Sequence, residues 1–131
     1  GPKQEIVNDF SSADAILNHS NFDSVQTWMI KEIAKYEISK MKPISLDTLS
    51  NMYEDYWNLY NRKMFKAKNQ YYVKPSRKGQ HDYFQTELFC STESMEKRKL
   101  IKLFITKGKH RMLKSFDYSL NLPKEIIQEI A

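Results

Sequence analysis

Apolar residues recur every three or four positions after Asp23, and this spacing places them on one face of a helix. The residues with this spacing are Val25, Met29, Ile33 and Tyr36, with Trp28 beside them. Asp23 or Ser24 can accept hydrogen bonds from the free amide groups at a helix start, and Pro43 prevents the helix from continuing. The pattern therefore predicts a helix over residues 24–41.

A second amphipathic stretch follows Pro43. Ser45 is a good N-cap, and Asp47 places a negative charge in the first turn, where the helix dipole favours it. The apolar stripe of this helix is rich in aromatic residues and contains Leu46, Leu49, Tyr53, Tyr56 or Trp57, and Tyr60. Such a stripe is typical of a buried core, so core packing is favoured over an aromatic ligand cage.

The middle of the chain changes in character. Residues 71–73 have the composition of a strand, and residues 75–79 have the composition of a turn. From Ser91 or Thr92 to Gly108 the pattern predicts a third helix. The apolar side of that helix would contain Met95, Ile101, Phe104 and Ile105.

The remaining segments leave alternatives open. Residues 81–89 fit a short helix or a strand, and residues 109–120 fit two extended segments or another short helix. Pro123 suits the start of a last helix, whose apolar face contains Ile126, Ile127 and Ile130. We interpret residues 1–22 as a flexible or partly helical arm that begins with a tag remnant, Gly1-Pro2, on a domain excised from a longer protein.

This order of elements predicts a mainly α fold: a helix-turn-helix or winged-helix-like bundle of four to six helices with at most a short β-hairpin. A chain of 131 residues is long enough for one domain with a core and too short for two comfortable ones. Its 40% hydrophobic content excludes a disordered, highly charged chain. Residues 23–131 are therefore predicted to form a single helical domain.

Charge is distributed unevenly along the chain. Residues 62–114 contain 15 Lys+Arg and 4 Asp+Glu, a net charge of +11, whereas the rest contains 6 and 12, a net charge of −6. The two parts give the overall charge of +5. A basic stretch flanked by acidic sequence limits the binding partners to polyanions, an acidic protein surface, or the chain's own acidic segments.

The predicted third helix places cations on one face, because Arg98 and Lys102 are four residues apart and Lys99 lies beside them. The loop before it resembles a wing and adds further cations. The residues predicted to bind nucleic acid are Lys74, Arg77, Lys78, Lys97, Arg98, Lys99, Lys102, Lys107, Lys109 and Arg111. Only three of these ten are Arg, which favours attraction to a DNA or RNA backbone over base reading. A lysine-rich solvated surface without a ligand remains the alternative.

The sequence brings together no residues of a catalytic or metal site. His19, His81 and His110 are far apart, and Cys90 is the single cysteine, so a zinc site lacks ligands and an internal disulfide is excluded. The single cysteine fits a reducing compartment. No apolar run approaches the roughly 20 residues of a membrane span. We therefore expect a non-enzymatic protein with no catalytic residue, metal, cofactor or membrane partner.

A protein-interaction adaptor or homodimerisation domain is the alternative function. The aromatic stripe of the second helix or the isoleucine face of the last helix would then be exposed and would bind a partner. The residues that would matter are Trp57, Tyr60, Ile126 and Ile130. An acidic partner protein would instead contact the lysine-rich surface.

Two stretches, residues 42–57 and 106–130, resemble the SPK domain, which occurs in nematode proteins alongside SET and PHD modules and kinases. In the first stretch Pro43-Ile44-Ser45, Leu49 and Tyr53 match the turn and second helix of that family. In the second stretch the looser matches are Lys109, Arg111, Met112, Leu113 and Phe116, with Lys114-Ser115 interposed. The resemblance spans residues 25–130. It implies a nuclear, chromatin-associated module without a defined catalytic activity, and it carries over no site residues.

The first of these stretches also resembles a LOTUS winged-helix domain, in which a similar Ile-Ser-Leu turn enters the second helix. That family engages RNA or helicase partners. The glycine-tyrosine pattern of its third helix is missing from this chain, so this resemblance ranks second. The SPK resemblance implies a nuclear location, and a cytoplasmic granule or the cytosol is the alternative.

Overall fold

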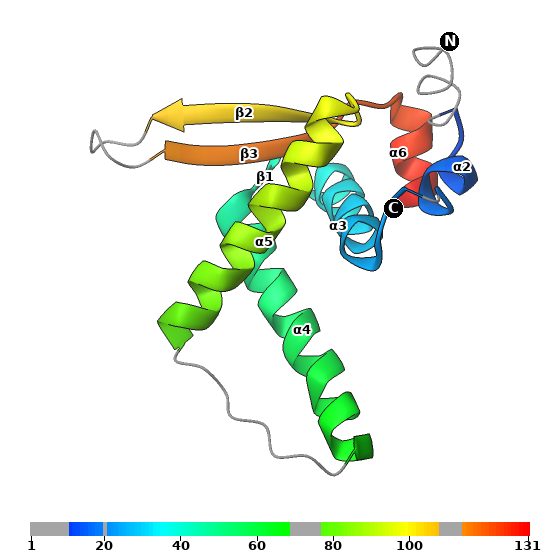
Figure 1. Ribbon diagram of the computed structural model, residues 1–131. Coiled ribbons are helices and arrows are strands. Elements are labelled where there is room, and N and C mark those ends of the chain that lie inside the picture. Colours follow the sequence, from blue (N-terminus) through cyan, green and yellow to red (C-terminus); the bar gives the residue numbers. More distant parts are fainter. Residues whose placement is uncertain (1–10, 20, 69–76, 108–113) are drawn as a thin grey trace.

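The computed structural model describes residues 11–19, 21–68, 77–107 and 114–131, with only the backbone described for residues 58–68, 77–83, 106–107 and 114. Within these ranges helices pack around a small antiparallel sheet (Figure 1). In chain order the elements are α2 (Ala13–Leu17), α3 (Ser24–Lys40), β1 (Ile44–Ser45), α4 (Leu46–Lys68), α5 (Arg77–Lys97), β2 (Ile101–Lys107), β3 (Lys114–Leu120) and α6 (Lys124–Ile130).

Helix α3 begins where the sequence predicts. Asp23 Oδ1 accepts a hydrogen bond from the Gln26 amide at 2.8 Å, and Gln26 Oε1 accepts one from the Asp23 amide at 3.1 Å. This capping box satisfies two amide groups at the helix start. The helix ends at Lys40, and Met41 adopts the left-handed conformation with φ of 57°. The predicted helix over residues 24–41 is confirmed.

The start of α4 is also confirmed. Ser45 Oγ accepts a hydrogen bond from the Thr48 amide at 3.1 Å, which is the N-cap role expected for it. The Tyr53 ring is buried and lies 5.3 Å from the Trp28 ring and 5.2 Å from the Phe84 ring, measured between centroids. At this position the aromatic stripe is core, as predicted.

Helix α5 differs from the prediction at both ends. It begins at Arg77, so residues 81–89 are helical and the predicted turn over residues 75–79 is wrong from residue 77 onward. Gly79 lies inside this helix. A glycine there costs only about 1 kcal/mol of helix stability, and the burial of Phe84 and Leu88 offsets this cost. The helix ends at Lys97, so the third helix predicted from Ser91 to Gly108 is wrong beyond that residue. The strand predicted over residues 71–73 lies outside the described residues.

A Schellman motif explains why α5 stops. The Leu100 amide donates a hydrogen bond to the Met95 carbonyl at 3.0 Å, and the Lys99 amide donates one to the Glu96 carbonyl at 2.8 Å. Met95 and Leu100 are fully buried, and they form the hydrophobic pair that accompanies this motif. Lys99 has the left-handed φ of 60° that glycine usually supplies. Because a lysine takes this position, the sequence contains no stop signal there.

Strands β2 and β3 form an antiparallel hairpin. Its register pairs Ile101 with Leu120 at the inner end and Lys107 with Lys114 at the outer end. Strand β1 pairs with the other side of β3, so the strand order is β1-β3-β2. Of the two alternatives for residues 109–120, the extended one is correct for β3, and residues 109–113 lie outside the described part of the chain.

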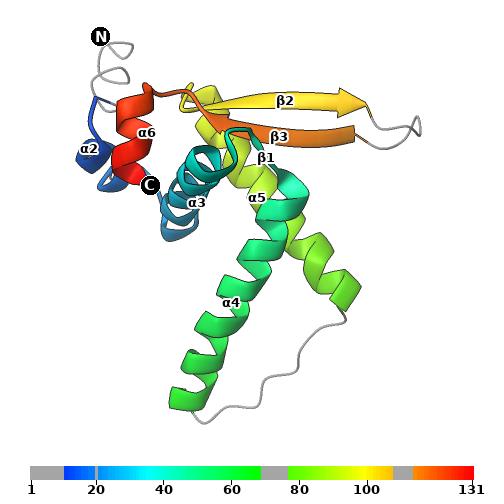
Figure 2. The same cartoon turned by 180° about the vertical axis from the view of Figure 1, so that it is seen from behind.

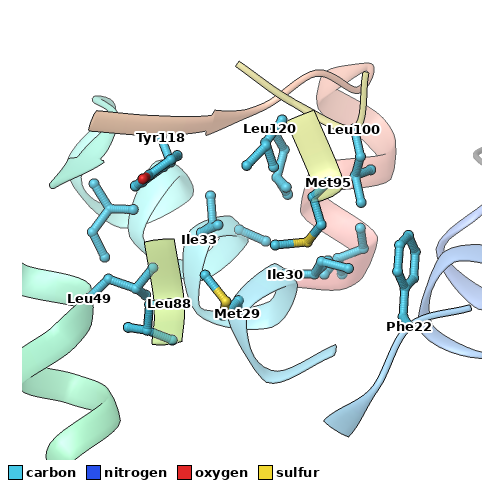
Figure 3. Packing of buried hydrophobic residues seen from close by; sticks show 14 of the residues in the cluster. Phe22, Met29, Ile30, Ile33, Leu49, Leu88, Met95, Leu100, Tyr118 and Leu120 are labelled. Atoms are coloured by element: carbon cyan, nitrogen blue, oxygen red, sulfur yellow. The ribbon is translucent and has the colours of Figure 1, made fainter. Parts of the chain in front are cut away.

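The core lies where α3, α4, α5 and β3 meet (Figure 3). Met29, Ile30 and Ile33 of α3 are fully buried between the other elements. Their neighbours in the cluster include Leu49, Leu88, Met95, Leu100, Tyr118 and Leu120. The core therefore joins the helices to one face of the sheet.

Helices α2 and α6 pack against each other and extend this core. Ile16 of α2 is fully buried, so the short helix predicted within residues 1–22 exists and the core begins before residue 23. Helix α6 packs on α3 as well, which buries Ile127 and leaves Ile130 only 6% exposed. The exposed isoleucine face required by the adaptor alternative is therefore absent at Ile130, and Ile126 is half-buried.

The mainly α fold class with a short β element is confirmed. From α3 to β3 the order is helix, strand, helix, helix, strand, strand, which is the order of a winged-helix domain. Figures 1 and 2 show the hairpin lying across the C-terminal end of α5, while α4 leads away from the sheet. The β2–β3 hairpin, rather than the segment from Lys74 to Lys78, therefore takes the place of the wing.

Candidate nucleic-acid interface

The last residue of α5 and the turn to β2 carry three consecutive cations. Lys97 and Lys99 are exposed, and Arg98 is half-buried. Asn121 holds this turn, because its side-chain amide donates to the Lys99 carbonyl at 2.8 Å and its backbone amide donates to the Leu100 carbonyl at 2.7 Å. The two lysines are thus presented to solvent from a fixed backbone.

Arg98 contacts its own chain. Its guanidinium carbon lies 5.8 Å from the centroid of the Phe22 ring, within the range of a cation–π contact. Phe22 is 9% exposed, so this contact attaches the segment before α3 to the end of α5. The predicted common helix face of Arg98 and Lys102 is wrong, because Arg98 lies in the turn and Lys102 lies in β2.

Lys102 is exposed on β2 and lies near an acid of its own chain, Glu37 of α3. Ser119, the cross-strand partner of Lys102, donates a hydrogen bond from Oγ to Glu37 Oε1. Burial raises the pKa of Glu37, while the Leu120 amide and the charge of Lys102 lower it by smaller amounts. Glu37 Oε2 is buried without a hydrogen-bond partner among the described residues. Lys102 therefore lies within electrostatic range of a carboxyl group of its own chain.

The outer end of the hairpin adds further cations. Lys107 and Lys114 are Cα partners in the last pair of the ladder. The connection between them contains Lys109 and Arg111, which lie outside the described residues, and no acidic residue. Like charges at directly opposite positions of an antiparallel pair are destabilising.

The remaining predicted cations lie before and at the start of α5. Arg77 and Lys78 occupy the first turn of the helix rather than a loop, and the structure describes only their backbone. Lys74 falls outside the described residues. The structure thus gives no support for a wing in this segment.

Residues 84–96 of α5 are acidic. Residues 84–96 contain Glu87, Glu93 and Glu96 and no Lys or Arg. An open depression of about 340 Å³ beside the helix is lined by Glu93, Glu96 and Lys97. Two carboxylates at its wall would repel a phosphate.

The aromatic residues of the adaptor alternative are partly covered. Trp57 is half-buried, with its ring centroid 5.2 Å from that of Phe84. Tyr56 stacks on Trp28 at 5.4 Å and remains 42% exposed. The side chain of Tyr60 is not described. A continuous open aromatic surface is therefore not formed by the described part of α4.

Metal-ligating side chains are scattered over the described ranges. No three His, Cys, Asp or Glu side chains gather there in a metal-binding arrangement. Cys90 is an exposed free thiol on α5. Among the same residues no helix combines the length and the apolar character that crossing a membrane requires.

The structure gives three residues positions that the sequence did not predict. Lys114 was not among the predicted contacts, and only the strand register reveals that it stands opposite Lys107. Phe104 and Ile105 were assigned to the apolar side of a helix, but they are 45% and 57% exposed on β2. The alternation of Ile101, Leu103 and Ile105 was the available signal for a strand.

Comparisons of the chain with protein-family models, curated proteins and solved structures find no match. The SPK and LOTUS resemblances therefore stay predictions from the sequence.

Proposed function

We propose that this protein is a non-enzymatic module that binds a nucleic-acid backbone, with the β2–β3 hairpin as its main contact. The observation that carries the proposal is the pairing of Lys107 with Lys114 at the outer end of the hairpin. From Lys97 to Lys114 the chain contains eight Lys+Arg and no Asp or Glu. A polyanion would relieve the repulsion within this set.

The proposal moves the contact from the third helix to the hairpin and the α5–β2 turn. Lys97 and Lys99 add to the hairpin charge next to a fixed turn, whereas Arg98 contacts Phe22 and Lys102 lies near Glu37. The acidic residues of α5 keep its described face away from phosphates. Binding would thus resemble a wing contact to the backbone without insertion of that part of α5 into a groove.

The composition of the charged set favours backbone contacts over base reading. Only Arg98 and Arg111 among its eight cations are arginines, and arginine is the residue that most often reads a guanine edge. We therefore expect little sequence preference. Contact with roughly six phosphates would give a slope of about −5 in a plot of log affinity against log salt concentration.

A titration at two salt concentrations tests the proposal. Fluorescence anisotropy of a labelled duplex of random sequence, and of one strand alone, is measured at about 50 mM and about 200 mM salt. We expect binding at low salt that falls by several orders of magnitude at high salt. Absence of binding to either probe at low salt contradicts the proposal.

The SPK resemblance supports a nuclear, chromatin-associated setting for this activity. The location is tested by imaging a fluorescently tagged full-length protein in cells. Enrichment in the nucleus is the expected result. Exclusion from the nucleus would move the proposed target from chromatin to cytoplasmic RNA.

A further inference from the structure

Strand β2 forms one edge of the sheet, since the strand order is β1-β3-β2. No described element pairs with its outer side, and Figure 1 shows β2 running along the outside of the hairpin. A strand edge of seven residues presents backbone N–H and C=O groups that another strand can pair with. Proteins usually shorten, charge or cover such an edge.

The middle of this edge is apolar. Phe104 is 45% exposed and Ile105 is 57% exposed, and successive residues of a strand point to opposite faces of the sheet. Ile105 continues the row of Ile101 and Leu103, whereas Phe104 lies on the other face. Both faces of the edge therefore carry exposed apolar surface next to its free backbone groups.

We propose that β2 pairs with β2 of a second copy of this chain, antiparallel and about a two-fold axis at Phe104, to form a continuous six-stranded sheet. Such a pairing is isologous, so it closes after two copies. Phe104 then stands opposite Phe104 of the second copy, and Leu103 stands opposite Ile105. Lys102 stands opposite Thr106, and Ile101 opposite Lys107. All seven residues of β2 take part.

The length of the ladder and its apolar pairs select this register. When two copies of a strand pair about a two-fold axis perpendicular to the sheet, the axis passes midway between the two copies of one residue. This follows because residues opposite each other must point to the same face. An axis at Leu103 shortens the ladder to five residues and places Lys102 opposite Phe104. An axis at Ile105 places Leu103 opposite Lys107. Only the axis at Phe104 combines the full ladder with apolar pairs and with no lysine opposite another.

This self-complementarity favours a second copy over an acidic extended peptide as the occupant of the edge. The dimer brings the basic outer end of each hairpin near the α5–β2 turn of the other copy, where Lys97 and Lys99 are exposed. The cations of the two copies repel each other in this arrangement. Salt screens this repulsion, because the Debye length falls to about 8 Å at 0.15 M. Dimerisation should therefore strengthen with salt, whereas nucleic-acid binding should weaken. A failure of one proposal can thus be distinguished from a failure of the other.

Disulfide trapping tests the register directly. In a C90S background, which removes the exposed native thiol, F104C is oxidised in the folded protein and I105C serves as the control. In the proposed register the residues at position 104 face each other, whereas those at position 105 are offset by two residues, too far apart for a disulfide. We expect F104C to cross-link at least about tenfold faster than I105C. Equal rates, or faster cross-linking of I105C, overturn the proposed register.

Sedimentation equilibrium at high salt tests the assembly itself. The wild-type protein should show twice its chain mass of 15.6 kDa, and F104K should return it to the mass of one chain by placing two lysines opposite each other. Because Phe104 is exposed, F104K should keep the circular dichroism spectrum of the wild type. A wild-type protein that stays monomeric at every salt concentration overturns the proposal. If such a monomer binds a polyglutamate peptide, an acidic peptide rather than a second copy occupies the edge.

Discussion

The Tyr118 hydroxyl lies 3.1 Å from Thr92 Oγ1, which joins β3 to α5 inside the core. Thr92 Oγ1 also donates to the Phe89 carbonyl at 2.8 Å, so the threonine hydroxyl accepts from Tyr118 while it donates to its own helix. Both residues are about 1% exposed. The hairpin that carries the basic charge is thus fixed to the helix at a buried polar contact.

Removing the tyrosine hydroxyl should weaken this attachment. Tyr118→Phe leaves Thr92 bonded to Phe89, so the expected loss is about 1 kcal/mol in the free energy of unfolding. Thr92→Val should cost more, since it leaves the Tyr118 hydroxyl buried without an acceptor, about 1–3 kcal/mol. Urea unfolding of both variants measures this. A Tyr118→Phe variant that is less stable than Thr92→Val would contradict the assignment of donor and acceptor.

The short helix α2 should contribute to stability as part of the core. Ile16 is fully buried, so Ile16→Ala should lower the free energy of unfolding by about 2–4 kcal/mol. Leu17→Ala is the matched control, because Leu17 is only half-buried and should cost less. Chemical denaturation compares the two. If Ile16→Ala were neutral, residues 13–17 would be an arm rather than part of the domain.

Much of the fold could be predicted from residues whose local chemistry permits one structure. Asp23 and Ser45 are capping residues followed by helical spacing, and Pro43 prevents continuation between them, so helix α3 and the start of α4 were predicted correctly, whereas strand β1 between them was not. The stretch from Ser91 to Gly108 was not, because Met95, Ile101 and Ile105 fit a helix face as well as a helix followed by a strand. The deciding turn has Lys99 at the left-handed position, which only the tertiary packing of Met95 and Leu100 explains.

The candidate site was predicted in composition but not in arrangement. The concentration of cations was visible in the sequence, and the lysines of the α5–β2 turn are exposed as expected. The pairing of Lys107 with Lys114 depends on a strand register, and the contact of Arg98 with Phe22 joins residues far apart in the chain. Such long-range relationships follow from the packed fold and leave no local pattern.

The raised pKa of Glu37 predicts how the stability of the protein changes with pH. Its pKa in the folded protein is raised above the ordinary 4.5, mainly by burial. The stability that it contributes is therefore fully present below the unfolded pKa and is lost as the pH rises through the folded value. Glu37→Gln does not titrate, so its stability relative to wild type should increase between pH 4 and pH 7. Thermal unfolding across this range measures the trend, and an opposite slope would show that Lys102 and Ser119 outweigh burial.

The central claim is that the basic hairpin binds the nucleic-acid backbone, and two variants with the same loss of charge test it most directly. The first replaces Lys107, Lys109, Arg111 and Lys114 by Gln, and the second replaces the exposed Lys31, Lys35, Lys40 and Lys42 by Gln. Each variant removes four positive charges from the protein. The measurement is the salt dependence of duplex affinity by fluorescence anisotropy.

The hairpin variant should lose most of its affinity at low salt, and its log-log slope should change from about −5 to about −2, since each lost phosphate contact removes about 0.9. The control variant should keep a slope near that of the wild type, because only the long-range attraction weakens. Equal losses in the two variants, or a larger loss in the control, would contradict the claim and would assign the binding to net charge alone.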